Sequence, residues 1–313
     1  MAVQLVGCST CDREAVILLK HSGQSLCQRC FAQSVEKRVQ NTISKYNMFT
    51  PTDRIAVAVS GGKDSVSLLH ILHKIETGFP KSELLAITID EGIAGYRDEA
   101  VQIAAENCRK LGIEHIVSSF KELYDYDLDD VVETAEDKGG LSACTYCGVL
   151  RRKALNVAAR RVGAEKLATA HTLDDETQTI LLNLLRGNVA WLARMEPVLE
   201  GERFIRRVKP LCEVPEAETA FYAFLKKVKF QSSTCPYMRS STRNDVRAFL
   251  NELETKHPGT KFAIYRSFEK INPSVRALAD DIGLKECDVC GEPTVGQTCR
   301  ACQVLLELGM LNR

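Results

Sequence analysis

The sequence predicts a doubly wound, parallel α/β sheet with a small zinc module at each end of the chain. In the middle of the chain, strand-like apolar runs alternate with helix-like segments, which is the pattern of parallel strands joined by right-handed crossovers. Paired cysteines gather near both termini, as small metal modules require. The length of 313 residues suffices for one core domain and two such modules.

The elements expected in the core domain follow one another in alternation. Strands are predicted at 54–59 (RIAVAV), 84–90, 115–120 and 166–171, and helices at 64–74, 97–111, 148–162 and 173–186. An amphipathic helix over 35–48 is expected to join the first module to the sheet, because Val35, Val39 and Ile43 share one face. The expected domains are an N-terminal zinc module (1–33), a linking helix (34–50), the core domain (51–283) and a C-terminal zinc module (284–313).

The charge balance excludes a uniformly basic nucleic-acid-binding protein, because 41 Lys and Arg face 41 Asp and Glu. The distribution is uneven, however. Residues 81–140 carry fifteen acidic and six basic side chains, whereas residues 201–250 carry ten basic and five acidic ones. Arg151, Arg152 and Lys153 form another basic run in the sequence. A locally basic surface for a phosphate backbone therefore remains possible.

The thirteen cysteines indicate a reducing compartment. The N-terminal residues lack the features of a secretory signal, and no apolar run is long enough to span a membrane. We therefore expect a cytoplasmic protein without a membrane partner, in which thiols bind metal rather than form disulfides. Cys108 and Cys212 have no paired spacing and are expected to be buried apolar residues.

Two groups of four cysteines have the spacing of structural zinc sites. Four thiolates complete a tetrahedral zinc shell and leave no position open, so both zinc ions should be structural. The N-terminal ligands are Cys8, Cys11, Cys27 and Cys30, and the C-terminal ligands are Cys287, Cys290, Cys299 and Cys302.

The hexapeptide SGGKDS follows the first core strand and precedes a helix. Two glycines allow a tight turn whose N–H groups and following helix N-terminus favour a phosphate. Its residues are Ser60, Gly61, Gly62, Lys63, Asp64 and Ser65. Asp64 could cap the helix or hold Mg²⁺. The spacing is not that of a Walker A loop.

This loop resembles the pyrophosphate loop of the N-type ATP pyrophosphatases, also called PP-loop enzymes. The segment AHTLDDET at 170–177 is similar to the family's later His-x-x-Asp-Asp segment, and Thr172 with Asp175 also has the spacing of a capping box. The resemblance implies ATP and Mg²⁺ as cofactors and catalytic roles for Asp64 and Asp175. Besides the SGGKDS residues, it implies nucleotide contacts from Ala58, Ile89, Ala170 and Asp175.

An internal pair, Cys144 and Cys147, combines with the distant Cys235. Zinc could take these three with a water, but an iron–sulfur cluster with one open iron is the preferred interpretation. The combination resembles the TtcA/TtuA group of tRNA thiolation enzymes, which implies a 4Fe–4S cluster. The terminal modules and the segment 90–97 resemble its TtuA and wobble-uridine branch. We expect Arg151 and Lys153 to act on the substrate beside the cluster.

The resemblance implies an ATP-dependent tRNA 2-thiouridine synthetase. It would adenylate the uridine C2 oxygen, release pyrophosphate and replace the activated oxygen with sulfur. The implied partners are tRNA and a sulfur donor, either sulfide or the thiocarboxylate of a ubiquitin-like protein. A homodimer is also considered, because the apolar residues Val304, Leu305, Leu308 and Leu311 could form a seam or ordinary core.

Four alternatives stay open at this point. They are TtcA-like 2-thiolation of cytidine, thiolation through a cysteine persulfide without a catalytic cluster, an ammonia-using ligase such as a GMP synthetase, and an RNA-binding zinc protein without catalysis. The terminal modules argue against the first, and the intact SGGKDS loop argues against the last.

Overall fold

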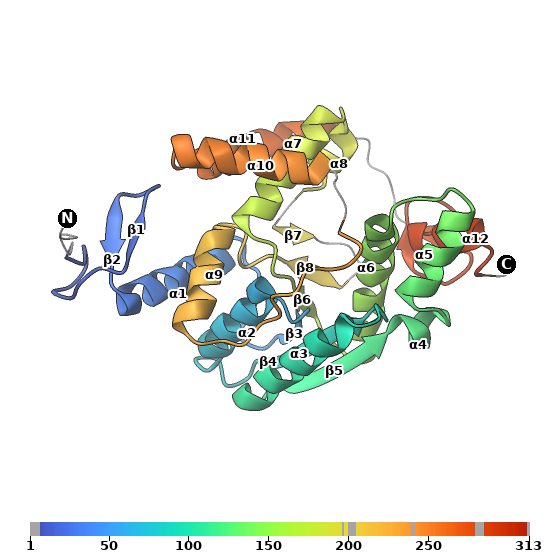
Figure 1. Cartoon of the computed structure of the whole chain (residues 1–313), viewed down its shortest axis with the longest axis horizontal. Coiled ribbons are helices and arrows are strands. Elements are labelled where there is room, and N and C mark those ends of the chain that lie inside the picture. Colours follow the sequence, from blue (N-terminus) through green and yellow to red (C-terminus); the bar gives the residue numbers. More distant parts are fainter. Residues whose placement is uncertain (1–6, 196, 200–204, 239–241, 279–284, 312–313) are drawn as a thin grey trace.

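The computed structural model describes residues 7–195, 197–199, 205–238, 242–278 and 285–311. Its core is a six-stranded sheet in the order β5-β4-β3-β6-β8-β7, parallel except for the pairing of β7 with β8 (Figure 1). This arrangement confirms the predicted parallel sheet. The strands are β3 (Arg54–Ala58), β4 (Glu83–Asp90), β5 (Glu114–Ser119), β6 (Lys166–Ala168), β7 (Val198–Leu199) and β8 (Arg206–Val208).

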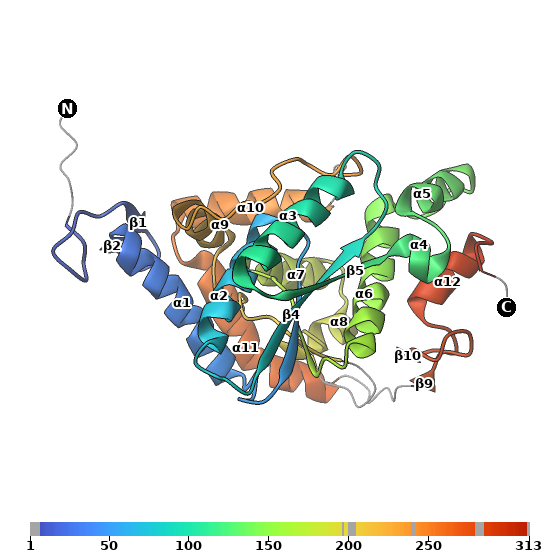
Figure 2. The ribbon, with the colours of Figure 1, turned by 90° about the horizontal axis from the view of Figure 1, so that it is seen from below.

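Helices cover both faces of the sheet (Figure 2). Successive side chains of a strand point to opposite faces, so each strand contributes to the core under both layers of helices. Ile55 and Val57 of β3 belong to the core cluster of the face that carries α1, α2 and α9. Ala56 belongs to the cluster of the other face, with α5, α6 and α12. The helices near the site are α1 (Gln28–Lys45), α2 (Lys63–Glu76), α3 (Arg97–Leu111), α5 (Leu128–Asp137), α6 (Ala143–Arg161), α7 (Leu173–Leu185) and α9 (Glu216–Leu225).

The remaining elements are short or peripheral. The N-terminal module holds the hairpin β1 (Ile17–Leu19) and β2 (Gln24–Leu26), and the C-terminal module holds β9 (Lys285–Glu286), β10 (Pro293–Thr294) and α12 (Arg300–Glu307). The two modules lie at opposite ends of the molecule (Figure 1). The other helices are α4 (Phe120–Tyr124), α8 (Val189–Ala193), α10 (Thr242–Lys256) and α11 (Thr260–Leu278).

Two helices begin earlier than the sequence predicts. Helix α6 starts at Ala143 rather than at residue 148, because Ser142 adopts the extended backbone of an N-cap after two glycines. Cys144 and Cys147 therefore lie in a helix and not in the loop before it. Helix α1 starts at Gln28 with Cys27 as its N-cap, so it crosses the boundary expected between residues 33 and 34.

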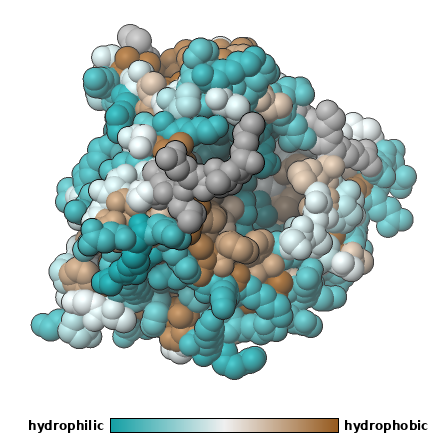
Figure 3. All heavy atoms as spheres, turned by 60° about the vertical axis from the view of Figure 1, so that its left-hand side comes forward, coloured by the Kyte–Doolittle hydropathy of each residue, from teal (hydrophilic) through white to brown (hydrophobic). Residues whose placement is uncertain are grey.

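The apolar C-terminal residues considered for a dimer seam belong to the core of the chain itself. Val304, Leu305 and Leu308 are buried in the cluster that includes α6, and Leu311 packs against it. Those side chains therefore give no support to a dimer interface. Among the described residues, no helix is both long and apolar enough to cross a membrane. The face in Figure 3 is largely hydrophilic, with small scattered apolar areas.

Candidate active site

The segments predicted to carry chemistry meet at one edge of the sheet. Strands β4, β3, β6 and β8 are parallel neighbours, so their carboxyl ends lie side by side. The segment 90–97 follows β4, the SGGKDS loop follows β3, and the segment 169–175 follows β6. Ligands of doubly wound sheets bind at this edge, beyond the carboxyl ends of the strands.

The SGGKDS loop is held in a closed turn by its own hydroxyl groups. The Ser60 N–H donates to Ser65 Oγ over 3.1 Å, and Ser65 Oγ donates to the Gly62 carbonyl over 2.9 Å. Gly62 is the N-cap of α2, and it has no side chain that could accept a hydrogen bond from the first N–H groups of the helix. No hydrogen bond to Asp64 caps these groups either. The turn thus directs a helix N-terminus at the place where phosphates are expected.

Gly61 is the position in this loop that cannot carry a side chain. Its φ is +84°, and a Cβ built there would lie 2.5 Å from the Ala100 carbonyl oxygen of α3. We expect Gly61→Ala to weaken ATP binding at least about tenfold, because the loop must move away from α3 or change its backbone conformation. Calorimetric titration with ATP measures the effect. Gly62→Ala is the matched control, since a Cβ there meets nothing closer than Ser60 Oγ at 3.5 Å; equal losses in both variants would contradict the expectation.

Lys63 and Asp64 form a charged cluster with α9. Lys63 Nζ lies 2.8 Å from Asp64 Oδ2 and 2.6 Å from Glu216 Oε1, and Thr219 Oγ1 donates to the other Asp64 oxygen. Burial raises the pKa of Asp64, while Lys63 and Thr219 oppose that shift. The Asp64 carboxylate lies at the loop, where it would be available to Mg²⁺ bound with phosphates.

The segment after β6 is tied down by the predicted capping box. Asp175 Oδ2 accepts from the Thr172 N–H and hydroxyl, each over 2.9 Å. The neighbouring acidic residues are already engaged elsewhere: Asp174 accepts from Lys261 and from the Glu216 N–H, and Glu176 pairs with Lys209. Asp175 is thus the acidic residue of this turn with the fewest tertiary contacts among the described residues, which suits the ligand role predicted for it.

His171, which precedes this turn, stands at the same edge. Its Nδ1 lies 2.8 Å from Thr169 Oγ1. Desolvation by burial lowers the pKa of His171 to about 4, and the nearby positive charge of Lys209 acts in the same direction. His171 is therefore neutral at physiological pH.

The three internal cysteines come together from two distant parts of the chain. Cys144 Sγ lies 3.7 Å from the carbonyl oxygen of Tyr237, two residues after Cys235. Burial raises the pKa of Cys147 to about 11, with the Cys235 and Cys144 thiols adding to the rise and Arg151 opposing it. Tyr237 anchors its loop by donating to Asp129 Oδ1 over 2.7 Å.

The spacing of these thiols differs from that of a single-ion site. Among the described residues, only the two terminal groups place three or more ligand atoms within 4.8 Å of one another. Each cysteine of an iron–sulfur cluster binds a separate iron, so its ligands stand farther apart than those of one zinc ion. The three cysteines, gathered but not closely packed, therefore fit a cluster better than a zinc ion.

A chain of ion pairs, buried except at Arg151, joins the SGGKDS loop to the cysteine helix, and no sequence pattern predicts it. The Arg97 guanidinium donates to the carbonyls of Ser60 and Ile89, over 3.0 and 2.6 Å. Its Nε lies 2.6 Å from Glu91 Oε2, and Glu91 Oε1 lies 3.3 Å from Arg151 Nη1. Glu91 is only 2% exposed. We name Arg97, Glu91 and Arg151 the arginine bridge.

The structure separates the two basic residues predicted to act on the substrate. Arg151 follows Cys147 by four residues, so both occupy one face of α6. Lys153 lies a little over half a turn farther round the helix, and its Nζ lies 3.4 Å from Cys302 Sγ of the C-terminal module. This contact places the Lys153 ammonium group at the C-terminal module, and its predicted action on the substrate stays a prediction.

The other predicted nucleotide-binding residues lie at the expected edge. Ala58 ends β3, Ile89 is buried near the end of β4, and Ala170 follows β6. Ile89 also accepts the bond from Arg97, which ties it to the arginine bridge. The expected bystanders Cys108 and Cys212 are both buried.

Both terminal groups of cysteines have the geometry of a zinc site. Four sulfurs about 2.3 Å from one zinc ion lie about 3.8 Å from one another. Cys11 Sγ lies 3.7 Å from Cys27 Sγ and 3.6 Å from Cys30 Sγ, and Cys290 Sγ lies 3.7 Å from Cys299 Sγ. Backbone hydrogen bonds, of which that from Cys27 has the largest effect, lower the pKa of Cys8 to about 6. The lower pKa favours the thiolate form, which is the form that zinc binds.

We expect Cys11→Ser to release one zinc equivalent and expose the N-terminal module to protease. A module this small has little core of its own, so its fold depends on the metal. Metal analysis and limited proteolysis measure the two effects, with the exposed neighbour Thr10→Ala as control. Full zinc content and unchanged proteolysis in Cys11→Ser would contradict a structural zinc site.

Comparison with known proteins defines the class of this fold and site. Residues 31–254 match the model of the PP-loop domain, and residues 8–32 match that of the N-terminal LIM domain of 2-thiouridine synthetase TtuA. The chain is 38% identical to tRNA 2-thiolation protein NcsA of Haloferax volcanii, over 95% of this chain and 98% of that one.

Two further relatives narrow the class. The tRNA-5-methyluridine(54) 2-sulfurtransferase of Pyrococcus horikoshii is 35% identical over 95% of this chain and 92% of its own. The structure of the U34-tRNA thiolase NcsA from Methanococcus maripaludis, with its [4Fe-4S] cluster, superposes with a TM-score of 0.86 at 32% identity and covers 99% of both chains. This chain belongs to the PP-loop tRNA 2-thiolation family and is a sulfurtransferase of that family.

Proposed function

We propose that this chain activates the C2 oxygen of a uridine in tRNA with ATP and replaces it with sulfur. The observation that carries the proposal is the arginine bridge, which connects the SGGKDS loop directly to the helix of Cys144 and Cys147. A nucleotide loop and a cysteine site that share one rigid connection suit a reaction in two consecutive steps on the same base.

In the first step, the SGGKDS loop and α2 hold the phosphates of ATP. The uracil C2 oxygen attacks the α-phosphate, a P–O bond forms, and pyrophosphate leaves with the electron pair of the broken P–O bond. Lys63 is placed to neutralise charge on the phosphates, and Asp64 to bind Mg²⁺. Asp175 lies in the first turn of α7, which follows the neighbouring strand β6. Adenylation makes the C2 oxygen a good leaving group, because it departs as part of AMP.

In the second step, sulfur enters at C2 and AMP leaves. We assign Cys144, Cys147 and Cys235 as ligands of a [4Fe–4S] cluster, and such a cluster with three protein ligands supplies one open iron for an external sulfur. Arg151 stands beside Cys147 with a positive charge suited to an anionic sulfur species. The proposed sulfur donor is sulfide or the thiocarboxylate of a ubiquitin-like protein. Thirteen unpaired cysteines are compatible with the proposed cytoplasmic location.

The test is nucleoside analysis of unmodified tRNA after anaerobic incubation with the cluster-loaded protein, ATP and sulfide. We expect 2-thiouridine, with one AMP and one pyrophosphate formed per sulfur, and no product when ATP is omitted. The thiolated position is then mapped, and a thiocarboxylate protein replaces sulfide in a second arm. The proposal is wrong if the product is 2-thiocytidine, or if loaded protein that binds tRNA and ATP forms no thiolated nucleoside.

A further inference from the structure

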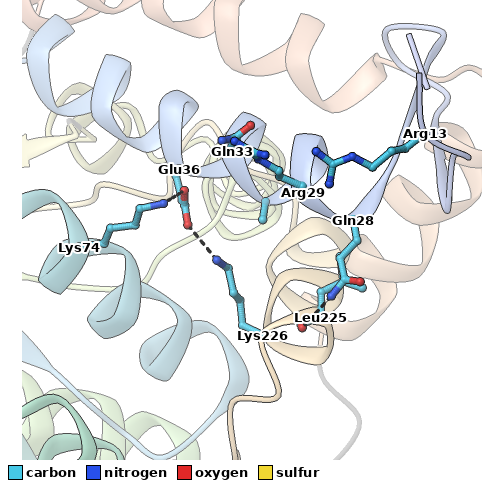
Figure 4. A pocket seen from close by; sticks show the side chains of 9 residues that line it. Arg13, Gln28, Arg29, Gln33, Glu36, Lys74, Leu225 and Lys226 are labelled. Carbon is cyan, nitrogen blue, oxygen red and sulfur yellow. Dashed lines mark hydrogen bonds and ion pairs between the residues drawn. The ribbon is translucent and has the colours of Figure 1, made fainter. Parts of the chain in front are cut away.

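A hollow lies at the far end of α2 from the SGGKDS loop. It opens between the N-terminal module, α1, α2 and the end of α9, with a volume of about 480 Å³ (Figure 4). Lys74 on its wall follows Lys63 by eleven residues in α2, which places the two backbones about 16 Å apart. The hollow is therefore separate from the nucleotide loop. Its charged lining residues are Arg13, Arg29, Glu36, Lys74 and Lys226.

One buried carboxylate arranges two of these cations. Glu36 is 8% exposed and accepts from the Tyr222 hydroxyl over 3.1 Å. Lys74 Nζ lies 2.5 Å from one of its oxygens and Lys226 Nζ lies 3.4 Å from the other, as the dashed lines in Figure 4 show. Both lysine side chains remain substantially exposed, so their ammonium groups are fixed at the wall of the hollow while still open to a ligand.

Two arginines contribute charge that no described residue balances. Neither the Arg13 nor the Arg29 guanidinium has a hydrogen bond or ion pair with any described part of the chain, and Figure 4 shows Arg13 extending from the module toward the α1 residues. The metal module fixes both backbones. The Arg13 carbonyl accepts from the Cys8 N–H over 2.8 Å, and Arg29 stands between Cys27 and Cys30.

The hollow thus gathers four cations against the single carboxylate of Glu36. Planar guanidinium groups bind phosphate through paired hydrogen bonds, and lysines add point charges. Such contacts fix the position of a nucleic acid without reading its sequence. We propose that this hollow binds backbone phosphates of tRNA at a distance from the modified base. The identity of the polyanion rests on the proposed function.

The test measures tRNA binding by the metal-loaded, full-length protein as a function of salt. We expect the double variant Arg13→Gln, Arg29→Gln to bind unmodified tRNA about tenfold more weakly. The slope of log K against log salt should fall by about 1.5, because each lost RNA phosphate contact removes about 0.7 to 0.9. The matched control is Lys20→Gln, Lys37→Gln, which removes two exposed charges from the same module and helix outside the hollow. ATP affinity should be unchanged in both variants.

Each outcome decides the proposal. An unchanged salt slope in the arginine variant, with wild-type binding intact, overturns it and leaves the proposed function standing. Equal losses in both variants overturn it too, because the effect is then one of net charge. If the arginine variant has a normal salt slope for tRNA binding and thiolates more slowly only when a thiocarboxylate protein supplies the sulfur, the hollow binds the sulfur donor. That result rejects RNA as its ligand. Failure of the wild-type protein to bind any tRNA contradicts the proposed function itself.

Discussion

Replacing Cys235 with alanine is expected to abolish tRNA thiolation, lowering the rate by about 1,000-fold or more, while ATP still binds. Cys235 reaches the α6 cysteines from a separate loop that Tyr237 anchors through Asp129. Without it, two ligands from a single helix remain, and these cannot hold a four-iron cluster with one open iron. Among the described residues, Cys235 itself has no hydrogen bond to the SGGKDS loop. The segment before it is tied to that loop by the Gln231 N–H, which donates to the Gly61 carbonyl over 2.9 Å and is kept in the variant, so nucleotide binding should survive.

Three measurements check this result. They are iron per chain after anaerobic loading, 2-thiouridine formed in tRNA, and ATP affinity by calorimetry. Thr234→Ala is the matched control, because Thr234 is the exposed neighbour of Cys235 in the same loop. If Cys235→Ala retains its iron and its thiolation rate, the cluster has other ligands and our assignment is wrong. Retained thiolation with no iron would favour the persulfide alternative.

Breaking the arginine bridge is expected to have the second-largest effect. Glu91→Gln leaves the Arg97 guanidinium, 5% exposed, without its carboxylate. Removing one member of a buried ion pair costs about 3–5 kcal/mol of unfolding free energy, so the melting temperature should fall. Thiolation should fall about 100-fold, since Arg97 also holds the Ser60 carbonyl and Arg151 positions the cysteine helix.

A second variant separates function from folding. Arg151→Gln removes the more exposed end of the bridge and should leave the melting temperature close to that of the wild type. We expect a similar loss of thiolation with normal ATP affinity. Arg152→Gln is the control, because it removes the same charge from the next residue of α6 and Arg152 makes no ion pair among the described residues. If Arg151→Gln thiolates tRNA as fast as Arg152→Gln does, the bridge is structural only.

Patterns within a single element predicted most of the fold. The helix over 97–111 has the bounds expected from its apolar face, and the zinc groups close as their spacing indicates. The predicted start of α6 at residue 148 was wrong, because the sequence Cys144-Thr145-Tyr146-Cys147 has no apolar periodicity that would indicate a helix. Its helical state depends on Tyr146, which is buried and accepts the Leu141 N–H over 3.0 Å.

Contacts between residues of different elements could not be predicted from the sequence. The segment 90–97 followed a strand and was noticed, but nothing in it shows that Glu91 meets Arg151, sixty residues away. The predicted helix over 148–162 already contains Arg151 and Lys153, so helical phase alone indicates that these two side chains lie on different sides. The true start of α6 was needed to place Cys147 on the same face as Arg151.

The contact between Lys153 and Cys302 has a consequence for the order of assembly. Helix α6 carries the cysteine pair at its beginning and receives α12, near the end of the chain, against its middle. Residues 285–311 follow every strand of the six-stranded sheet in the chain, so they leave the ribosome after that sheet and the SGGKDS loop. The helix that carries Cys144 and Cys147 therefore gains the support of α12 after the nucleotide loop can already fold. Nucleotide binding can thus mature before the sulfur chemistry.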